Sequence, residues 1–140
     1  MLLVLSNQNN DRLYGNETDK SLNETSDPAI HIVFTGEENG YLEPCGCSEK
    51  ELGGLPKRHS LINLLRERDE NWILLSLGDL PGKVGRQDEI KMETTLKALD
   101  QMDYTAHNIG EKDISMGIDL LGYLSQISSV DFISSNIVNL

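Results

Sequence analysis

Acidic residues gather in three short segments that each follow a stretch of apolar, strand-like sequence. The segments are Gly36-Glu37-Glu38-Asn39-Gly40, Leu77-Gly78-Asp79-Leu80 and Ile109-Gly110-Glu111-Lys112-Asp113. In an open α/β sheet, ligands bind outside the carboxyl ends of the strands, where such loops meet. Carboxylates that meet there need a cation to neutralise them. The sequence therefore predicts an acidic site whose cation is either a bound metal ion or the ammonium group of Lys112.

A second group with chemical potential is the pair Cys45 and Cys47, the only cysteines in the chain. A disulfide between cysteines one residue apart would close a small, strained ring that is easily reduced. The pair could bind a soft metal, join a redox couple or bond to cysteines of another polypeptide segment, although two thiolates alone do not complete a zinc site. Structural loop thiols are an equal alternative.

The remaining candidates for chemistry have simpler interpretations. His31 and His107 fall in predicted strands and His59 in a predicted helix, where packed or hydrogen-bonded histidines are the usual case. Gly53-Gly54 before Lys57-Arg58 predicts a glycine turn and a helix with surface cations rather than an anion site.

From Ala29 onward, strand-like and helix-like segments alternate along the sequence, and these segments position the residues described above. Short β-branched or apolar runs predict strands at 30–35, 72–77, 104–109 and 130–135. Between them, three apolar stripes at helical spacing predict helices: Leu61, Ile62, Leu64 and Leu65; Met92, Leu96, Leu99 and Met102; and Ile118, Leu121 and Leu124. Strands separated by single helices pair in parallel through right-handed crossovers, so the predicted fold class is α/β with a parallel-rich sheet and βαβ crossovers.

Residues 1–28 differ from the rest and are predicted to be a disordered leader or the remnant of an export signal. The segment from 29 to 140 is the predicted domain. It ends directly after the fourth predicted strand, and because parallel sheets normally bury both faces, we expect it to be the N-terminal part of a larger protein.

Charge and hydropathy exclude two classes of partner. The 140 residues include 12 basic and 23 acidic side chains, a formal net charge of −11, which disfavours nucleic acid because phosphate backbones attract clustered Lys and Arg. No stretch approaches the roughly 20 apolar residues that span a bilayer.

Taken together, the segments resemble the N-terminal half of the calcineurin-like metallophosphoesterases, 5'-nucleotidase branch. The family's Asp-X-His-Gly, Gly-Gly-Leu-X-Arg-Arg, Gly-Asp, Gly-Asn-His-Glu and Ser-X-Asn-Ile motifs correspond in order and spacing to residues 37–40, 53–58, 78–79, 110–113 and 134–137. Glu43-Pro44-Cys45-Gly46-Cys47 is similar to a segment of one sub-branch. The resemblance implies half of a metallophosphoesterase αββα sandwich, in an exported or cell-envelope protein.

The resemblance also implies a metal site, which this sequence has largely changed. Glu37, Asn39, Asp79 and Glu111 stand at family ligand positions and Lys112 stands at the position of the family's transition-state histidine; only Asp79 matches the family residue. Oxygen ligands of this kind suit Mg²⁺ or Mn²⁺, and Fe is a further candidate. A charged Lys112 would repel a divalent ion, and its ammonium among Glu37, Asp79 and Asp113 would hold the loops together without metal.

Two functional hypotheses follow. The first is a diverged, incomplete phosphate-ester hydrolase that is inactive as this chain alone and needs a C-terminal half or a partner chain. The alternative is a non-catalytic binding or thiol-redox module that uses the acidic crevice or Cys45 and Cys47.

Overall fold

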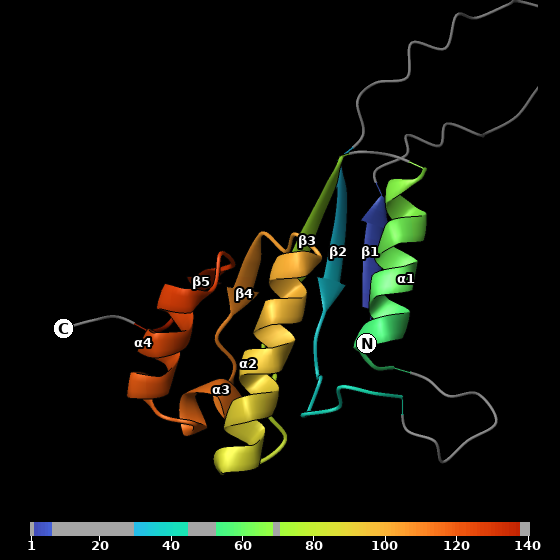
Figure 1. Ribbon diagram of the computed structural model, residues 1–140. Coiled ribbons are helices and arrows are strands. Elements are labelled where there is room, and N and C mark those ends of the chain that lie inside the picture. Colours follow the sequence, from blue (N-terminus) through green and yellow to red (C-terminus); the bar gives the residue numbers. More distant parts are fainter. Residues whose placement is uncertain (1, 7–29, 45–52, 69–70, 138–140) are drawn as a thin grey trace, which may run out of the picture.

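The chain folds as a five-stranded sheet with helices between the strands (Figure 1). The computed structural model describes residues 2–6, 30–44, 53–68 and 71–137. The strands are β1 (Leu2–Ser6), β2 (His31–Thr35), β3 (Trp72–Ser76), β4 (Ala106–Asn108) and β5 (Asp131–Ile133). The helices are α1 (Leu55–Arg66), α2 (Arg86–Gln101), α3 (Glu111–Ser115) and α4 (Ile118–Ile127).

The sheet order β1-β2-β3-β4-β5 confirms the predicted α/β class. Strands β2 to β5 pair in parallel, with Val33 opposite Leu74 and Ser76 opposite His107. Strand β1 is different, because it lies antiparallel to β2 at the edge of the sheet. The sequence interpretation missed this strand by assigning its residues to the leader. Residues 7–28 of the expected leader lie outside the described part of the chain.

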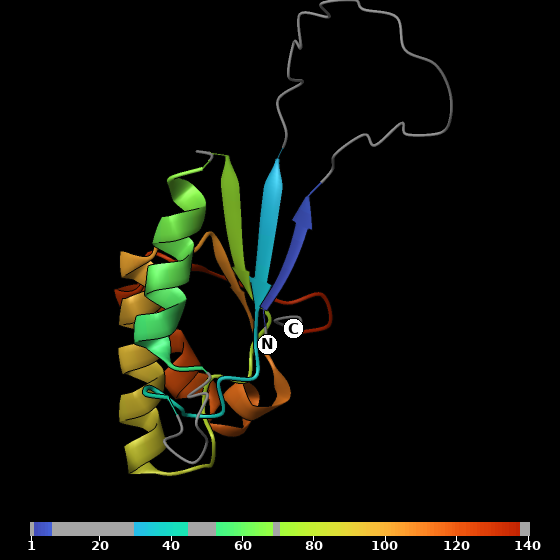
Figure 2. The ribbon, with the colours of Figure 1, turned by 90° about the vertical axis from the view of Figure 1, so that its right-hand side faces the viewer.

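All three long helices lie on one face of the sheet, as the side view shows (Figure 2). Their inward residues form the core with Val33 and Leu74 of the central strands. The predicted stripe of α2 is confirmed in full, since Met92, Leu96, Leu99 and Met102 are all buried.

The other two predicted stripes are confirmed only in part. On α1, Ile62 is buried but Leu61 and Leu64 are exposed, and on α4 the first residue, Ile118, is exposed. Helix α1 lies toward the β1 edge of the sheet (Figure 1), where it has a neighbouring helix on only one side. A helix at such an edge buries a narrower stripe than a central helix does, so its outer leucines stay in solvent.

Helix α3 is the other element that the sequence interpretation missed. We predicted a loop after the third strand, whereas α3 begins at Glu111, directly after Gly110. A helix of five residues is too short to show a 3.6-residue period, so its only sequence signal is the acidic first turn formed by Glu111 and Asp113.

Candidate functional site

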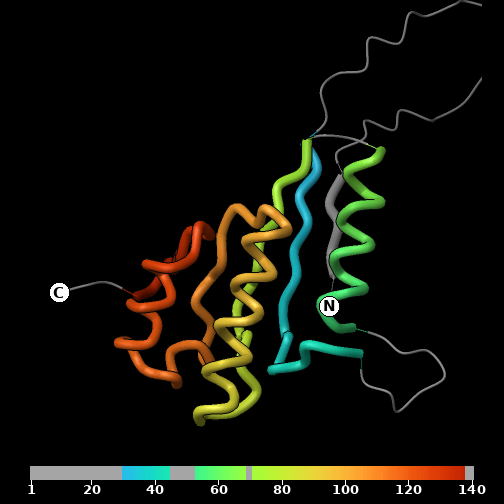
Figure 3. Tube along the Cα trace, viewed as in Figure 1, coloured from blue at the N-terminus to red at the C-terminus, as the bar shows by residue number. Residues whose placement is uncertain are grey.

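The loops after β2, β3 and β4 meet at the carboxyl end of the sheet, as the tube view shows (Figure 3). Backbone hydrogen bonds join the first two loops: the Asn39 amide donates to the Asp79 carbonyl at 3.2 Å, and the Gly40 amide donates to the Leu80 carbonyl at 2.7 Å. The structure therefore brings together the three acidic segments of the sequence.

The buried carboxylate of Asp113 organises this end of the sheet. Its Oδ2 accepts hydrogen bonds from the amides of Asp79 and Gly110, both at 2.8 Å, and its Oδ1 accepts one from the amide of Leu80 at 3.0 Å. Its side chain is fully buried, and His107 Nε2 lies 3.5 Å from Oδ2. Burial acts to raise the pKa of Asp113, but the neighbouring His107 ring and the backbone amides of Gly110 and Asp79 outweigh it, so the pKa lies below its ordinary value.

His107 is a packed histidine, as we predicted for a histidine in a strand. Its Nδ1 lies 3.0 Å from Ser76 Oγ, and its ring meets the edge of Phe132 at 5.1 Å between centroids. Ser76, His107 and Asp113 thus follow one another in the order of a serine hydrolase triad. All three are buried, with Ser76 only 2% exposed and the other two at 0%, so no substrate reaches this row. Its role is to fix β3, β4 and α3 to one another.

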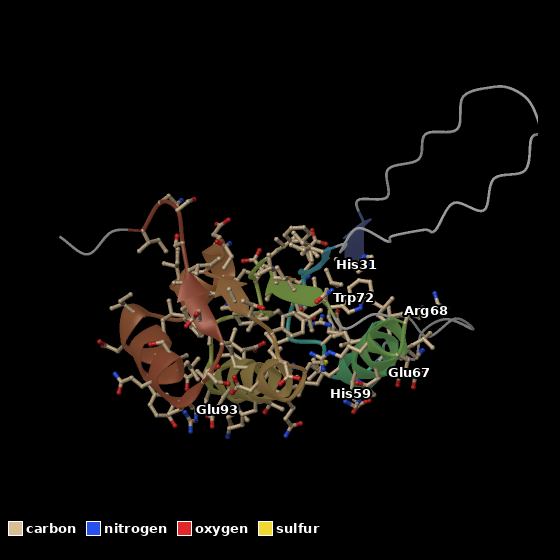
Figure 4. All side chains as sticks on the ribbon, turned by 90° about the horizontal axis from the view of Figure 1, so that it is seen from above. His31, His59, Glu67, Arg68, Trp72 and Glu93 are labelled. Carbon is tan, nitrogen blue, oxygen red and sulfur yellow. The ribbon has the colours of Figure 1, made fainter. Side chains whose placement is uncertain are left out.

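The other two histidines have partners outside the strand-end loops. His31 stacks on Trp72 of the neighbouring strand with 4.4 Å between ring centroids, and both lie where β2 and β3 begin (Figure 4). His59 lies on α1, where its Nε2 is 3.3 Å from the Asn63 side chain.

Lys112 links the first and third loops. Its backbone amide donates to Asp79 Oδ1 at 2.9 Å, and its ammonium donates to Asn39 Oδ1. The Asn39 side chain in turn donates to the Glu37 carbonyl at 3.1 Å. Within the described residues Lys112 forms no ion pair with a carboxylate. The expected cluster of its ammonium with Glu37, Asp79 and Asp113 is therefore wrong. The ammonium contacts the amide oxygen of Asn39 instead, and the Asp113 carboxylate accepts hydrogen bonds from backbone amides.

Three residues of these loops have left-handed backbone conformations. Glu37, Asn39 and Asp79 have φ angles of 59°, 50° and 59°, which non-glycine residues adopt at an energetic cost. All three stand at positions that we selected as candidate metal ligands. Glycines permit the close approach of the loops: a Cβ on Gly110 would collide with Asp79 Oδ1, and one on Gly78 would lie 2.7 Å from the Asn108 carbonyl oxygen.

The candidate ligands do not form a metal centre of the family's kind. Glu37 and Glu111 are exposed, Asn39 Oδ1 is occupied by the Lys112 ammonium, and Asp79 Oδ1 accepts the Lys112 amide. Among the residues that the structure describes, no three His, Cys, Asp or Glu side chains converge on a point where they could hold a metal ion. The donor set present therefore does not fit a divalent metal pair.

A buried ion pair next to the site escaped the sequence interpretation. Glu38 Oε1 lies 2.5 Å from Arg58 NH1, and the Glu38 side chain is 2% exposed. Arg58 is thus not the surface cation that we predicted; it fixes α1 to the loop after β2. Beside the pair, Tyr104 donates to Thr35 Oγ1 at 3.1 Å, and burial raises the pKa of this phenol. Two adjacent glutamates after a strand can face opposite ways, but the sequence does not show which of them is buried, because that depends on the distant Arg58.

The candidates Cys45 and Cys47 lie outside the described residues. In the described part of the chain no helix has the length and apolar character that crossing a bilayer requires.

Comparison with known proteins finds similarity at the level of structure. No family model and no curated protein matches the sequence. The NAD nucleotidase NadN of Haemophilus influenzae matches 96% of this chain with a TM-score of 0.62 and 15% identity. The calcineurin-like phosphoesterase YfkN of Bacillus subtilis matches 73% of it with a TM-score of 0.55 and 19% identity. The chain covers 21% of the first structure and 35% of the second, so the likeness concerns part of each fold.

Proposed function

We propose that this chain, which has the fold of part of a calcineurin-like phosphoesterase, is a diverged phosphoesterase-like domain that does not hydrolyse phosphate esters on its own. The family supplies a clear expectation for the strand-end loops, namely metal ions that clamp a phosphate and activate water. The residues present here support a different arrangement.

The observation that carries the proposal is the contact between the Lys112 ammonium and Asn39 Oδ1. This contact places a fixed positive charge between the first and third loops, where the family resemblance puts metal ligands. A divalent ion within a few ångströms would be repelled, since two unit charges 4 Å apart already interact by about 4 kcal/mol at the effective dielectric of a protein surface. The ammonium and a metal pair are therefore alternatives.

The charge balance of the loops supports the same conclusion. Three backbone amides and His107 surround the carboxylate of Asp113. Glu37 and Glu111 are exposed, so water neutralises them at little cost. The carboxylates of Asp113, Glu37 and Glu111 are thus balanced by amides, His107 or water, and Asp79 Oδ1 accepts the Lys112 amide, which supports an arrangement without metal.

The test is an activity assay of the purified chain with p-nitrophenyl phosphate and nucleoside 5'-monophosphates, in the presence of Mn²⁺, Mg²⁺ or Fe²⁺. We expect no turnover that a chelator removes, and metal analysis of the protein should give well under one ion per chain. Turnover that is lost both with chelator and in Asp79→Asn would overturn the proposal. An Asp119→Asn variant, which changes an exposed carboxylate at the start of α4, is the matched control for that substitution.

A further inference from the structure

Helices α1 and α4 lie at the two edges of the helix layer. Helix α1 is at the β1 end of the sheet and α4 is at the β5 end, with α2 between them (Figure 1). Each of these helices leads into a strand that pairs in parallel with the strand before it, so the helices run in the same direction, opposite to the strands. In the described part of the chain, the outer side of each edge helix has no neighbouring helix.

The outer side of α1 has apolar residues between two cations. His59 lines the groove between α1 and Ala98 of α2, so at 3.6 residues per turn the opposite side of the helix faces away from α2. The residues on that side, including one in the turn after the helix, are Lys57, Leu61, Leu64 and Arg68. Leu61 and Leu64 are 37% and 47% exposed. Figure 4 shows His59 and Arg68 on different sides of α1.

The outer side of α4 has a large apolar residue next to a glycine. The two buried leucines of α4 belong to the core, and Tyr123 lies near Arg86 of α2. The side that remains includes Ile118 and Gly122, one turn apart, with Asp119 next to them. Ile118 is 71% exposed, and a Cβ added to Gly122 would contact nothing within 4 Å. Glycine weakens a helix, and no close approach within this chain requires it here, so the position suits a neighbour from outside.

The two edges have opposite charges. Residues 55–68 include four basic and one acidic side chain, a formal charge of +3, whereas residues 113–137 include three acidic and no basic side chains, a formal charge of −3. An anion stabilises the N-terminus of a helix and a cation stabilises its C-terminus. The first turn of α1 has no acidic residue and the last turn of α4 has no basic one. Each edge helix therefore lacks a charge that the other edge carries.

We propose that a second copy of this chain binds at these edges, with α1 of one copy packed against α4 of the next. With the two helices parallel, Leu61 and Leu64 would pack against Ile118 and over Gly122. Asp119 would lie near the N-terminus of α1, beside Lys57. The contact joins two different surfaces, so it is heterologous and can repeat from molecule to molecule.

The net charge of −11 opposes association but does not prevent it. At physiological ionic strength the Debye length is about 8 Å, so charges on distant parts of two copies are largely screened, whereas the charges at the contact are opposite in sign. Self-association does not depend on whether the chain hydrolyses phosphate esters. It is measured without substrate or metal, so failure of one proposal leaves the other intact.

The first test uses one variant of each edge in the full chain. Leu64→Glu places a carboxylate on α1 opposite Asp119, and Gly122→Arg places a large cation on α4 opposite Lys57. Both new residues favour helix. The matched controls are Gln87→Glu and Gln87→Arg, which make the same changes of charge at an exposed position on α2.

The oligomeric state is measured by sedimentation equilibrium over a range of concentrations. We expect wild type and both controls to form species larger than a dimer. Each edge variant alone should associate at least tenfold more weakly, because a like charge then faces each contact. An equal mixture of the two edge variants should form a 1:1 dimer and nothing larger, since each variant keeps the edge that the other has lost.

A charge exchange tests the same contact without those substitutions. Lys57→Glu and Asp119→Lys should each weaken self-association about tenfold, and the chain that carries both should regain most of it at an unchanged net charge. Lys83→Glu and Glu43→Lys are the controls for the two single changes, because both positions are exposed and lie outside the two edges.

Three results would overturn the proposal. One is a wild-type chain that stays monomeric at every concentration. Another is a mixture of the edge variants that does not associate while both variants melt as wild type does, since the contact would then be symmetric or elsewhere. The third is a double charge exchange that associates no better than either single variant.

Discussion

Two residues on the third acidic segment, one buried and one partly exposed, have opposite roles at this site. Asp113 is fully buried and binds backbone amides, whereas the neighbouring Lys112 reaches across to Asn39 in the first loop. The sequence presents both simply as charged residues after a strand. Because their surroundings differ, the Asp113 carboxylate holds backbone amides inside the fold and the Lys112 side chain links two loops.

At the residue scale we predict that Asp113→Asn destabilises the protein by about 2–4 kcal/mol, because hydrogen bonds to a charged group contribute about 1.5–3 kcal/mol each and an amide retains only one acceptor oxygen. Urea denaturation measures this change. The control Asp119→Asn removes an exposed carboxylate and should stay within about 0.5 kcal/mol of wild type. A loss for Asp113→Asn as small as for the control would contradict the role assigned to Asp113.

The same carboxylate predicts a pH dependence. The pKa of Asp113 is lowered in the folded protein, so its stabilising contribution is complete above the ordinary carboxyl pKa of 3.8 and is lost as the pH falls below that value through the folded-state pKa. We therefore expect the unfolding free energy of wild type to fall more steeply below pH 4 than that of Asp113→Asn. Parallel curves for the two proteins would rule this linkage out.

Lys112→Met removes the ammonium while keeping a side chain of similar length. Without this charge, Mn²⁺ is no longer repelled from Asn39 and Asp79, so we expect its affinity to rise at least tenfold, which calorimetry would detect. Lys97→Met is the control, because Lys97 lies on α2 and pairs with Glu93. Equal effects of the two substitutions would mean that net charge alone sets metal affinity.

At the scale of elements, the Glu38–Arg58 ion pair determines how α1 is attached to the loop after β2. A buried ion pair adds little stability over a well-packed apolar pair, but removing one member leaves an unpaired charge at high cost. Helix α1 buries only Ile62, whereas α2 buries four of its residues. The ion pair therefore contributes more to holding α1 on the sheet than a single polar contact would for α2.

We predict that Arg58→Ala destabilises the protein by about 3–5 kcal/mol, since it leaves the Glu38 carboxylate buried and unpaired. Adding Glu38→Gln should recover part of the loss, and a double-mutant cycle gives the coupling. The control is Arg86→Ala, because the Arg86–Glu89 pair is exposed and such pairs contribute at most about 1 kcal/mol. Additive effects of Arg58→Ala and Glu38→Gln would show that the pair is not coupled.

At the scale of the whole molecule, the main feature is the one-sided placement of the helices. Helices α1, α2 and α4 lie on one face of the sheet, where Ser76 and His107 of the central strands are buried, whereas Ile32, Phe34, Ile73 and Leu75 of β2 and β3 are partly exposed. A sheet of this kind is half of a layered fold.

The sequence by itself determined the alternation of strands and helices, the parallel pairing and the meeting of three acidic segments at one edge, because periodicity and chain order are local properties. It did not reveal β1 or α3, which are too short or too isolated to show a period. It also did not distinguish the exposed Glu37 from the buried Glu38, or predict that Asp113 binds backbone amides rather than Lys112. Those outcomes depend on partners far away in the sequence, such as Arg58 for Glu38 and His107 for Asp113. Only the tertiary structure decides which cation or amide reaches a carboxylate, and thereby whether an acidic segment binds metal or holds the fold together.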